Sequence, residues 1–160
     1  MRAWRIYDHR AAYASQPDFD PLDGAGGLHG DSRWHHRGQP ILYAASSPSL
    51  ALLETLVHID PRRFQQQTLL QLEVGDDAER VTRAQLAQIL RDAPEHDPVA
   101  GTRDYGTAWL AEKRTLVLVV PSLVMPFEDN IILNPQHPLA TSIRILVSER
   151  ITLDQRLVGD

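Results

Sequence analysis

The sequence contains no cysteine, and lysine occurs once, at Lys113, among sixteen basic residues. Without cysteine the chain has no disulfide framework, no thiolate ligand for zinc and no cysteine nucleophile. No apolar run reaches the roughly 18 residues of a membrane span, and the opening MRAWRIYDHR has no signal-peptide core. These absences agree with a reducing compartment, and we expect a cytoplasmic protein that does not associate with a membrane.

An excess of positive charge is also missing. Sixteen basic residues stand against 21 acidic ones, which gives a formal net charge of −5. Binding a nucleic-acid backbone requires clustered positive charge, so we expect no direct nucleic-acid contact and disfavour an RNA-cleaving enzyme. The basic residues are almost all arginine, whose forked guanidinium suits contacts with a phosphate group.

Several catalytic signatures are absent as well. There is no H-E-x-x-H helix, and the adjacent His35 and His36 would point to opposite faces of an extended chain, so we expect no metal site. No G-x-S-x-G elbow surrounds Ser122, which disfavours serine hydrolase chemistry. The GAGG sequence at residues 24–27 lacks the Lys-Ser/Thr ending of a phosphate-binding loop.

The length of 160 residues and the 42% hydrophobic content are typical of one globular domain, which we assign to residues 1–160. Apolar and alternating runs predict strands at 4–7, 41–45, 68–74, 115–120, 131–133 and 142–147. The run at 115–120 is the best candidate for a central strand. Because strands and helices alternate irregularly, we predict an α+β fold with a mixed β-sheet core and flanking helices, and disfavour a doubly wound nucleotide fold.

Helix signals are clear at two positions. Ser47 and Pro48 suit the N-cap and the first helical position of an apolar helix that ends near Asp60-Pro61. Thr82 and Gln85 have the spacing of a capping box that begins a second helix, ending near residue 91. A short helix is predicted at 105–112, after a connection rich in proline, glycine and aspartate at 92–104.

The segment from Ala14 to Gly30 is predicted to be a long loop because proline and glycine recur through it. Loops of this length inside a domain are often functional, and its glycines would allow the backbone to approach a ligand closely. The alternative is an ordinary surface loop.

Arg33, Tyr43 and Glu54 lie on three successive predicted elements: an extended segment, a strand and a helix. Arg33 is either a solvated surface arginine or a planar cation that grips a pyrophosphate. Tyr43 is either a half-buried aromatic residue or a platform that stacks on a heteroaromatic ring and directs its hydroxyl at a ribose or phosphate.

Glu54 lies on or beside the buried stripe of its predicted helix, where a carboxylate costs free energy unless it is paired. It either pairs with a buried arginine such as Arg5 or acts in catalysis, stabilising the positive charge that develops when a glycosidic bond breaks. Ser122 follows the predicted strand at 115–120. It either caps a turn or directs its hydroxyl at a ligand.

Long segments of the chain resemble the RES domain family, which is named for an arginine, a glutamate and a serine. The resemblance lies in SRWHHRGQPILYAASSPSLALLETLVH at 32–58, in VVPSLVMPFEDNIILNP at 119–135 and in the opening WRI with Arg5. The ending around Asp154, Arg156 and Leu157 is also similar. The three family residues fall on Arg33, Glu54 and Ser122, and the family's active-site tyrosine falls on Tyr43.

This resemblance implies a fold similar to that of the ADP-ribosyltransferases and an activity on NAD. It also implies that the chain is the toxin of a bacterial type II toxin–antitoxin pair, with an Xre-type antitoxin that covers the NAD pocket. The family often has glycines before the arginine, where this chain has Asp31 and Ser32, and asparagine after the tryptophan, where it has His35.

The resulting hypothesis is NAD depletion by hydrolysis or phosphorolysis of the nicotinamide–ribose bond. Arg33 would bind the pyrophosphate, with help from Arg5 or Arg37, and Tyr43 would pack on the nicotinamide or its ribose. Glu54 would stabilise the oxocarbenium-like transition state, and Ser122 would fix the nicotinamide or Glu54.

The alternatives are ADP-ribosyl transfer to a specific protein and a catalytically silent binding module. The sequence leaves the oligomeric state open, with a homodimer as one alternative.

Overall fold

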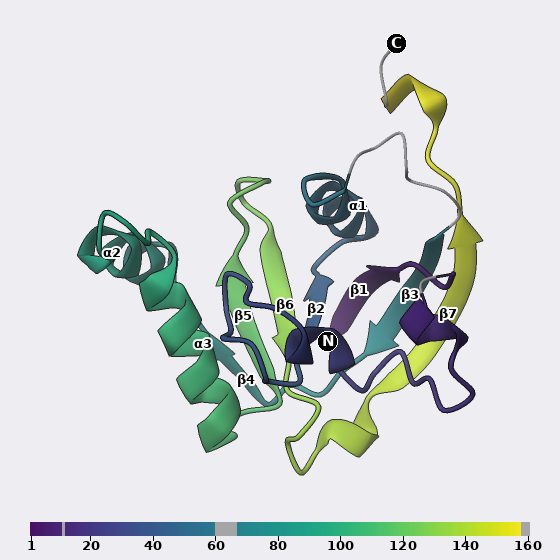
Figure 1. Cartoon of the computed structure of the whole chain (residues 1–160), viewed down its shortest axis with the longest axis horizontal. Helices are drawn as coiled ribbons and strands as arrows, with labels where there is room; N and C mark the ends of the chain where they lie inside the picture. Colours follow the sequence, from purple (N-terminus) through teal and green to yellow (C-terminus); the bar gives the residue numbers. More distant parts are fainter. Residues whose placement is uncertain (11, 60–66, 158–160) are drawn as a thin grey trace.

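The computed structural model describes residues 1–10, 12–59 and 67–157. Its strands form one sheet in the order β4-β5-β6-β2-β1-β3-β7 (Figure 1). The strands are β1 (Arg2–Tyr7), β2 (Leu42–Ala45), β3 (Gln67–Glu73), β4 (Ala78–Arg80), β5 (Val117–Pro121), β6 (Asp129–Leu133) and β7 (Arg144–Ile151). The helices are α1 (Pro48–Leu56), α2 (Arg83–Asp92) and α3 (Ala100–Glu112). The predicted α+β fold with a mixed sheet and flanking helices is confirmed.

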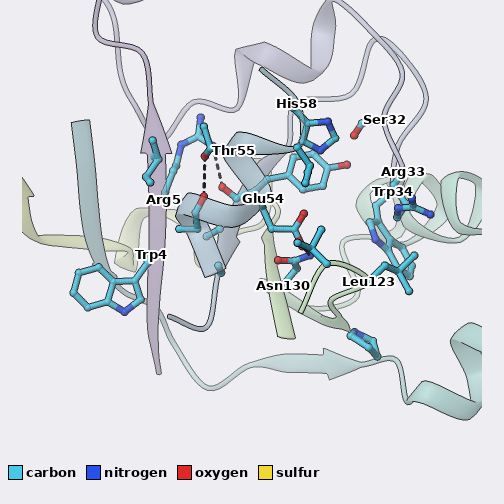
Figure 2. Close-up of a pocket in the computed structure, with 18 of the residues that line it drawn as sticks. Trp4, Arg5, Ser32, Arg33, Trp34, Glu54, Thr55, His58, Leu123 and Asn130 are labelled. Atoms are coloured by element: carbon cyan, nitrogen blue, oxygen red, sulfur yellow. Dashed lines mark hydrogen bonds between the residues drawn. The ribbon is translucent and has the colours of Figure 1, made fainter. Parts of the chain in front are cut away.

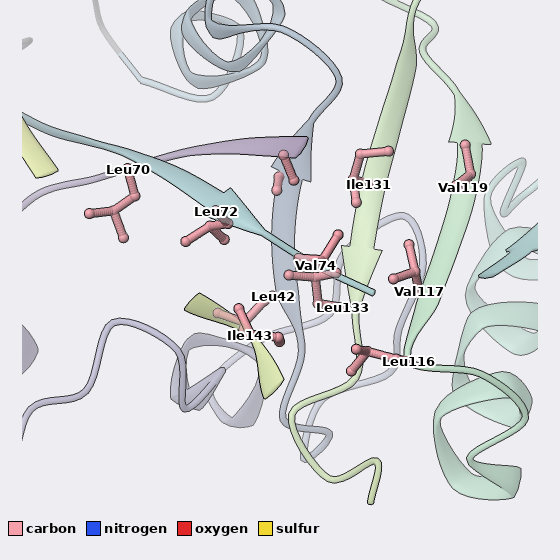
Figure 3. Packing of buried hydrophobic residues seen from close by; sticks show 12 residues of the cluster. Leu42, Leu70, Leu72, Val74, Leu116, Val117, Val119, Ile131, Leu133 and Ile143 are labelled. Carbon is pink, nitrogen blue, oxygen red and sulfur yellow. The ribbon is translucent and has the colours of Figure 1, made fainter. Parts of the chain in front are cut away.

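The sheet bends between β1 and β2, which share a single registered pair, Trp4 with Ala45. By contrast, β1 and β3 pair over six residues, from Arg2–Glu73 to Tyr7–Thr68. One apolar cluster contains side chains from β3, β5, β6 and β2 (Figure 3). The cluster also includes Ala3 of β1, so it follows one face of consecutive strands in the sheet order, and it is the largest buried apolar cluster among the described residues.

The opposite face of the sheet carries the three helices. Trp109 of α3 and Leu86 of α2 pack against Leu118 and Val120 of β5. Further along this face, Leu50 and Ala51 of α1 pack on Ala45, with Trp4 and Ile6 of β1 at the edge of the contact. Along each strand, alternate residues therefore face the helices, and the residues between them face the cluster on the other side of the sheet. No helix in the described ranges is both long and apolar enough to cross a membrane.

Local signals place the helix starts correctly. The hydroxyl of Ser47 accepts a hydrogen bond from the backbone N–H of Leu50, with Pro48 in the first turn. Both bonds of the capping box between Thr82 and Gln85 are present. The predicted end of α1 is too late, because the helix stops at Leu56. After it, the backbone N–H of His58 bonds to the carbonyl oxygen of Thr55, three residues earlier, as in a 3-10 turn. Asp60 and Pro61 lie outside the described residues.

Four further elements differ from the prediction. Strand β4 was missed because it has three residues. Strand β5 is second from the sheet edge, and its apolar run reflects burial on both faces rather than a central place, which β2 occupies. Strand β7 continues to Ile151 through the polar residues of an exposed edge. Helix α3 begins at Ala100, not residue 105, because its glycines are contact points rather than breaks.

The predicted loop at 14–30 includes short 3-10 turns at Ala12–Ser15 and Ala25–Leu28. Gly24 has a φ of 70°, and a Cβ on Gly27 would lie 2.1 Å from the backbone oxygen of Gln39. The glycines thus allow the loop to pack against the segment that leads into β2. None of residues 14–30 lines the large cavity of the protein.

A substitution at Gly106 tests the close packing of α3 against the backbone of Trp34. A Cβ at this position would lie 2.0 Å from the carbonyl oxygen of Trp34, so Gly106→Ala must push α3 away from that backbone. We expect a loss of about 1–3 kcal/mol in the free energy of unfolding, measured by urea denaturation, although alanine is the better helix former. Gly30→Ala is the matched control, because no atom lies within 4 Å of its added Cβ. Equal stability of the two variants would contradict the packing argument.

Candidate active site

A cavity of about 610 Å³ lies between α1 and α3, over the junction of β1 and β2 (Figure 2). Its size is within the range of small-molecule and cofactor sites. Its walls come from several elements: Arg5 from β1, Tyr43 from β2, Glu54 from α1 and Arg103 from α3. The loop segment 31–34 and the β5–β6 connection complete the walls.

Glu54 is the carboxylate that α1 presents to this cavity. The helix buries Leu50 and Ala51 on the sheet, and Glu54 lies about one turn further along the same side. Its Oε1 accepts two hydrogen bonds, one from the hydroxyl of Ser122 at 2.9 Å and one from the Nδ2 amide of Asn130 at 2.6 Å. These bonds offset part of the desolvation of a half-buried carboxylate.

The hydroxyl of Ser122 is saturated with hydrogen bonds. Its oxygen accepts from the backbone N–H groups of Val124 and Met125, both at 3.0 Å. A hydroxyl has two acceptor lone pairs and one proton, so the proton is left for Glu54. Ser122 is 2% exposed and does not itself line the cavity. The arrangement suits a residue that fixes Glu54, and it leaves no lone pair for nucleophilic attack.

Tyr43 lines the cavity and is supported from behind by His35. The phenol oxygen and the Nδ1 atom of His35 are 2.8 Å apart, a hydrogen bond that either neutral tautomer of the imidazole can form. Burial raises the pKa of Tyr43 to about 12 and lowers the pKa of His35. Both rings are therefore uncharged at neutral pH, and the tyrosine offers an aromatic face without a formal charge.

Arg33 is exposed at the cavity wall, and within the described part of the chain its guanidinium has no hydrogen bond or ion pair. The neighbouring Asp31 does not neutralise it. The carboxylate of Asp31 accepts the backbone N–H of Arg37 at 2.7 Å, and this bond lowers the pKa of Asp31. Arg37 itself is exposed and does not line the cavity.

Two further arginines face the cavity, each with a structural contact. Arg5 donates from Nη1 to the carbonyl oxygen of Tyr43 at 3.0 Å. Arg103 donates to Asp97 at 2.8 Å and from Nε to the backbone oxygen of Ser32 at 3.3 Å, so it joins α3 to the segment that carries Arg33. Three guanidinium groups therefore lie around this cavity, and that of Arg103 forms an ion pair with Asp97.

Comparison with known proteins identifies the family of this chain. The model of the RES domain matches residues 2–154, nearly the whole chain. The chain belongs to the RES domain family. Curated relatives of this RES domain include a Toxin Res from Pseudomonas putida, 42% identical over 98% of this chain and 99% of the relative. A protein called Prs ADP-ribosylating toxin, from a Sphingobium species, is 32% identical over 97% of this chain and 95% of the relative.

A solved structure shares the fold of this RES domain. It is the crystal structure of the MbcT–MbcA toxin–antitoxin complex from M. tuberculosis, which has a TM-score of 0.71. The match covers 99% of this chain and 89% of the solved chain, at 17% sequence identity. At this identity the likeness concerns the fold: the bent mixed sheet with its flanking helices.

The structure brings most of the predicted site residues of the RES domain together. Arg33, Tyr43, Glu54 and Arg5 line one cavity, with Ser122 bonded to Glu54 behind its wall, while Arg37 does not line it. Sequence reasoning assigned no role to Asn130 or Arg103, which reach the site from β6 and α3. No motif marks either residue, because each depends on the pairing of distant segments.

The buried His35 predicts a pH-dependent stability. Its pKa in the folded protein lies below the ordinary value of 6.5, so on acidification the unfolded chain takes up the proton first. The contribution of His35 to the free energy of unfolding is therefore fully present above about pH 6.5 and is lost as the pH falls below it. In His35→Asn this part of the loss should disappear, as measured by urea unfolding at about pH 8 and about pH 5. An equal loss in variant and wild type would contradict the prediction.

Proposed function

We propose that this RES domain cleaves the nicotinamide–ribose bond of NAD, by hydrolysis or phosphorolysis, as the toxin of a type II toxin–antitoxin pair. One observation carries the proposal: the exposed guanidinium of Arg33 and the anchored carboxylate of Glu54 line the same cavity (Figure 2). NAD joins an anionic pyrophosphate to a ribose that becomes cationic as the nicotinamide leaves. A cation and a carboxylate at separate places in one cavity match this distribution of charge.

Each residue has a role that its surroundings support. Arg33 binds the pyrophosphate with a guanidinium that pairs with no carboxylate in the described part of the chain, and Arg5, which lines the same cavity, adds a second cation. The neutral ring of Tyr43 packs on the nicotinamide or its ribose. Glu54 hydrogen-bonds the ribose hydroxyls and stabilises the oxocarbenium-like transition state, while Ser122 fixes the carboxylate.

One carboxylate suffices for this reaction. In an ordinary glycosidase a second carboxyl group must protonate the leaving oxygen. The nicotinamide of NAD is a pyridinium, so it leaves as a neutral ring when the bonding electron pair moves to its nitrogen. The ribose cation is then captured by water or phosphate, and the proton of that acceptor passes to solvent or to Glu54.

Glu54→Gln tests the central role. Glutamine keeps the shape of the side chain, and its oxygen can still accept from Ser122 and Asn130, so the fold should be retained. Loss of the negative charge should slow NAD consumption by about a hundred- to a thousand-fold. The assay follows NAD in purified protein and in bacteria after induction, with the exposed Glu95→Gln as a matched control. A Glu54→Gln protein as active as wild type would refute the assignment.

ADP-ribosyl transfer to a protein is the second candidate, since one relative is named an ADP-ribosylating toxin. NAD labelled in its adenylate part separates the two reactions. We expect free labelled ADP-ribose, or its phosphate, when purified protein is incubated with labelled NAD and a bacterial extract. If the label stays on one protein band, and this band is unlabelled with Glu54→Gln, the reaction is transfer to a protein and not hydrolysis. NAD that remains intact would indicate a silent binding module.

The partner that we propose is an Xre-type antitoxin that covers the cavity. Support comes from the fold, which is shared with the toxin chain of a toxin–antitoxin complex. Exposed apolar side chains at the cavity wall, Val57 and Leu123, provide surface that such a partner would bury. We place the activity in the cytoplasm, where the NAD pool is available to the chain.

A further inference from the structure

We propose that Asn130 is a positioning residue for Glu54: together with Ser122 it holds the Oε1 atom, so that only Oε2 is presented to the substrate. This inference rests on the proposed cleavage of NAD and assigns the geometry of its central carboxylate. The observation behind it is that two donors, one in β6 and one directly after β5, converge on one oxygen, at 2.6 Å from Asn130 and 2.9 Å from Ser122.

One donor lies in the sheet and the other at the end of one of its strands, whereas Glu54 comes from a helix. Asn130 lies in β6, paired in register with Val120 of β5 on one side and Ala45 of β2 on the other. Ser122 directly follows β5. Because the backbone pairing of β6 already fixes residue 130, the strand does not need its side chain. The asparagine side chain is therefore available to position the carboxylate.

The chemistry of the two donors determines the direction of each bond. An ionised carboxylate only accepts, so Asn130 must turn the NH₂ end of its amide toward Glu54. Ser122 has filled both lone pairs with the N–H groups of Val124 and Met125, so its proton also points to Glu54. Neither donor can reverse its role without leaving a buried group unpaired, which costs about 1–3 kcal/mol.

Two bonds to one oxygen restrict rotation of the terminal carboxylate torsion, which is otherwise soft. Among the described residues no hydrogen bond reaches Oε2, and Glu54 lines the cavity, so this second oxygen is the one left for a ligand. The donors are neutral, and this matters for the reaction. An arginine or lysine in place of Asn130 would fix the carboxylate equally well but would cancel the negative charge that stabilises the ribose cation.

The test compares Asn130→Ala and Asn130→Asp with wild type in steady-state NAD cleavage. Asp129→Asn is the matched control, because the Asp129 carboxylate pairs with Arg80 at 2.7 Å and does not line the cavity. For Asn130→Ala we expect kcat to fall about 10- to 100-fold with KM changed little, since the carboxylate is misplaced while the Arg33 contact remains. Asp129→Asn should keep wild-type kcat. Thermal unfolding confirms that each variant is folded.

The pH profile of Asn130→Asp is a second measurement, and a purely structural role of Asn130 would leave this profile like that of wild type. At acidic pH the introduced carboxyl group and Glu54 share one proton, and the introduced group, when protonated, can donate to Glu54 as the amide does. As the pH rises, both groups ionise and repel each other. The activity of Asn130→Asp relative to wild type should therefore be highest near pH 5 and fall toward about pH 8. The other charged or titratable side chains of the cavity (Arg5, Asp31, Arg33, Tyr43, His58 and Arg103) are common to both proteins.

The outcomes separate this inference from the proposed function. If wild-type protein cleaves NAD but Asn130→Ala has unchanged kcat, or Asn130→Asp follows the wild-type pH profile, the positioning role is overturned and the proposed function stands. If both variants lose activity by raising KM alone, Asn130 contacts the substrate instead, and the positioning role is again overturned. If wild-type protein does not cleave NAD, both proposals fall together.

Discussion

The site depends on the close packing of the segment 31–36 against α3. Gly106 allows the helix to touch the backbone of Trp34, and the buried ring of Trp34 meets Tyr105 edge to face. Polar contacts extend the attachment: the Thr107 hydroxyl accepts the backbone N–H of His36 at 2.9 Å, and Arg103 donates to the backbone of Ser32. These contacts fix the position of Arg33, whose own side chain makes no bond that would do so within the described part of the chain. Without this attachment, the wall opposite Glu54 would not exist.

Local chemistry made part of this arrangement predictable. The N-cap at Ser47, the capping box at Thr82 and the apolar runs of β2, β3 and β5 are encoded within a few residues, and they appear where expected. Arg33, Tyr43 and Glu54 could be proposed because they lie on consecutive elements. Asn130 could not be proposed, because its place beside Glu54 arises from the pairing of β6 with β2 and β5. Nothing in the neighbouring sequence distinguishes its amide. Gly101 of α3 was misjudged for a similar reason: a glycine that breaks a helix and one that lies against a neighbouring residue, here Ile89, look alike in sequence.

The net charge describes the whole chain and not the cavity. The chain carries a formal charge of −5, which argues against a broad basic surface. Within the cavity, however, Arg5, Arg33 and Arg103 lie on three different walls. Asp31 and Glu54 line the same cavity, and Asp97 pairs with Arg103. The exposed guanidinium of Arg33, which forms no ion pair within the described part of the chain, is therefore a group open to a compact anion such as the dinucleotide proposed above.

The saturated hydroxyl of Ser122 has a consequence for chemical tools. Fluorophosphonates and sulfonyl fluorides label serines whose oxygen can attack an electrophile, and here both lone pairs are committed to backbone N–H groups. We therefore expect such reagents not to label Ser122, although its hydroxyl donates to Glu54. Small molecules directed at the cavity would instead contact Arg33 and the aromatic face of Tyr43.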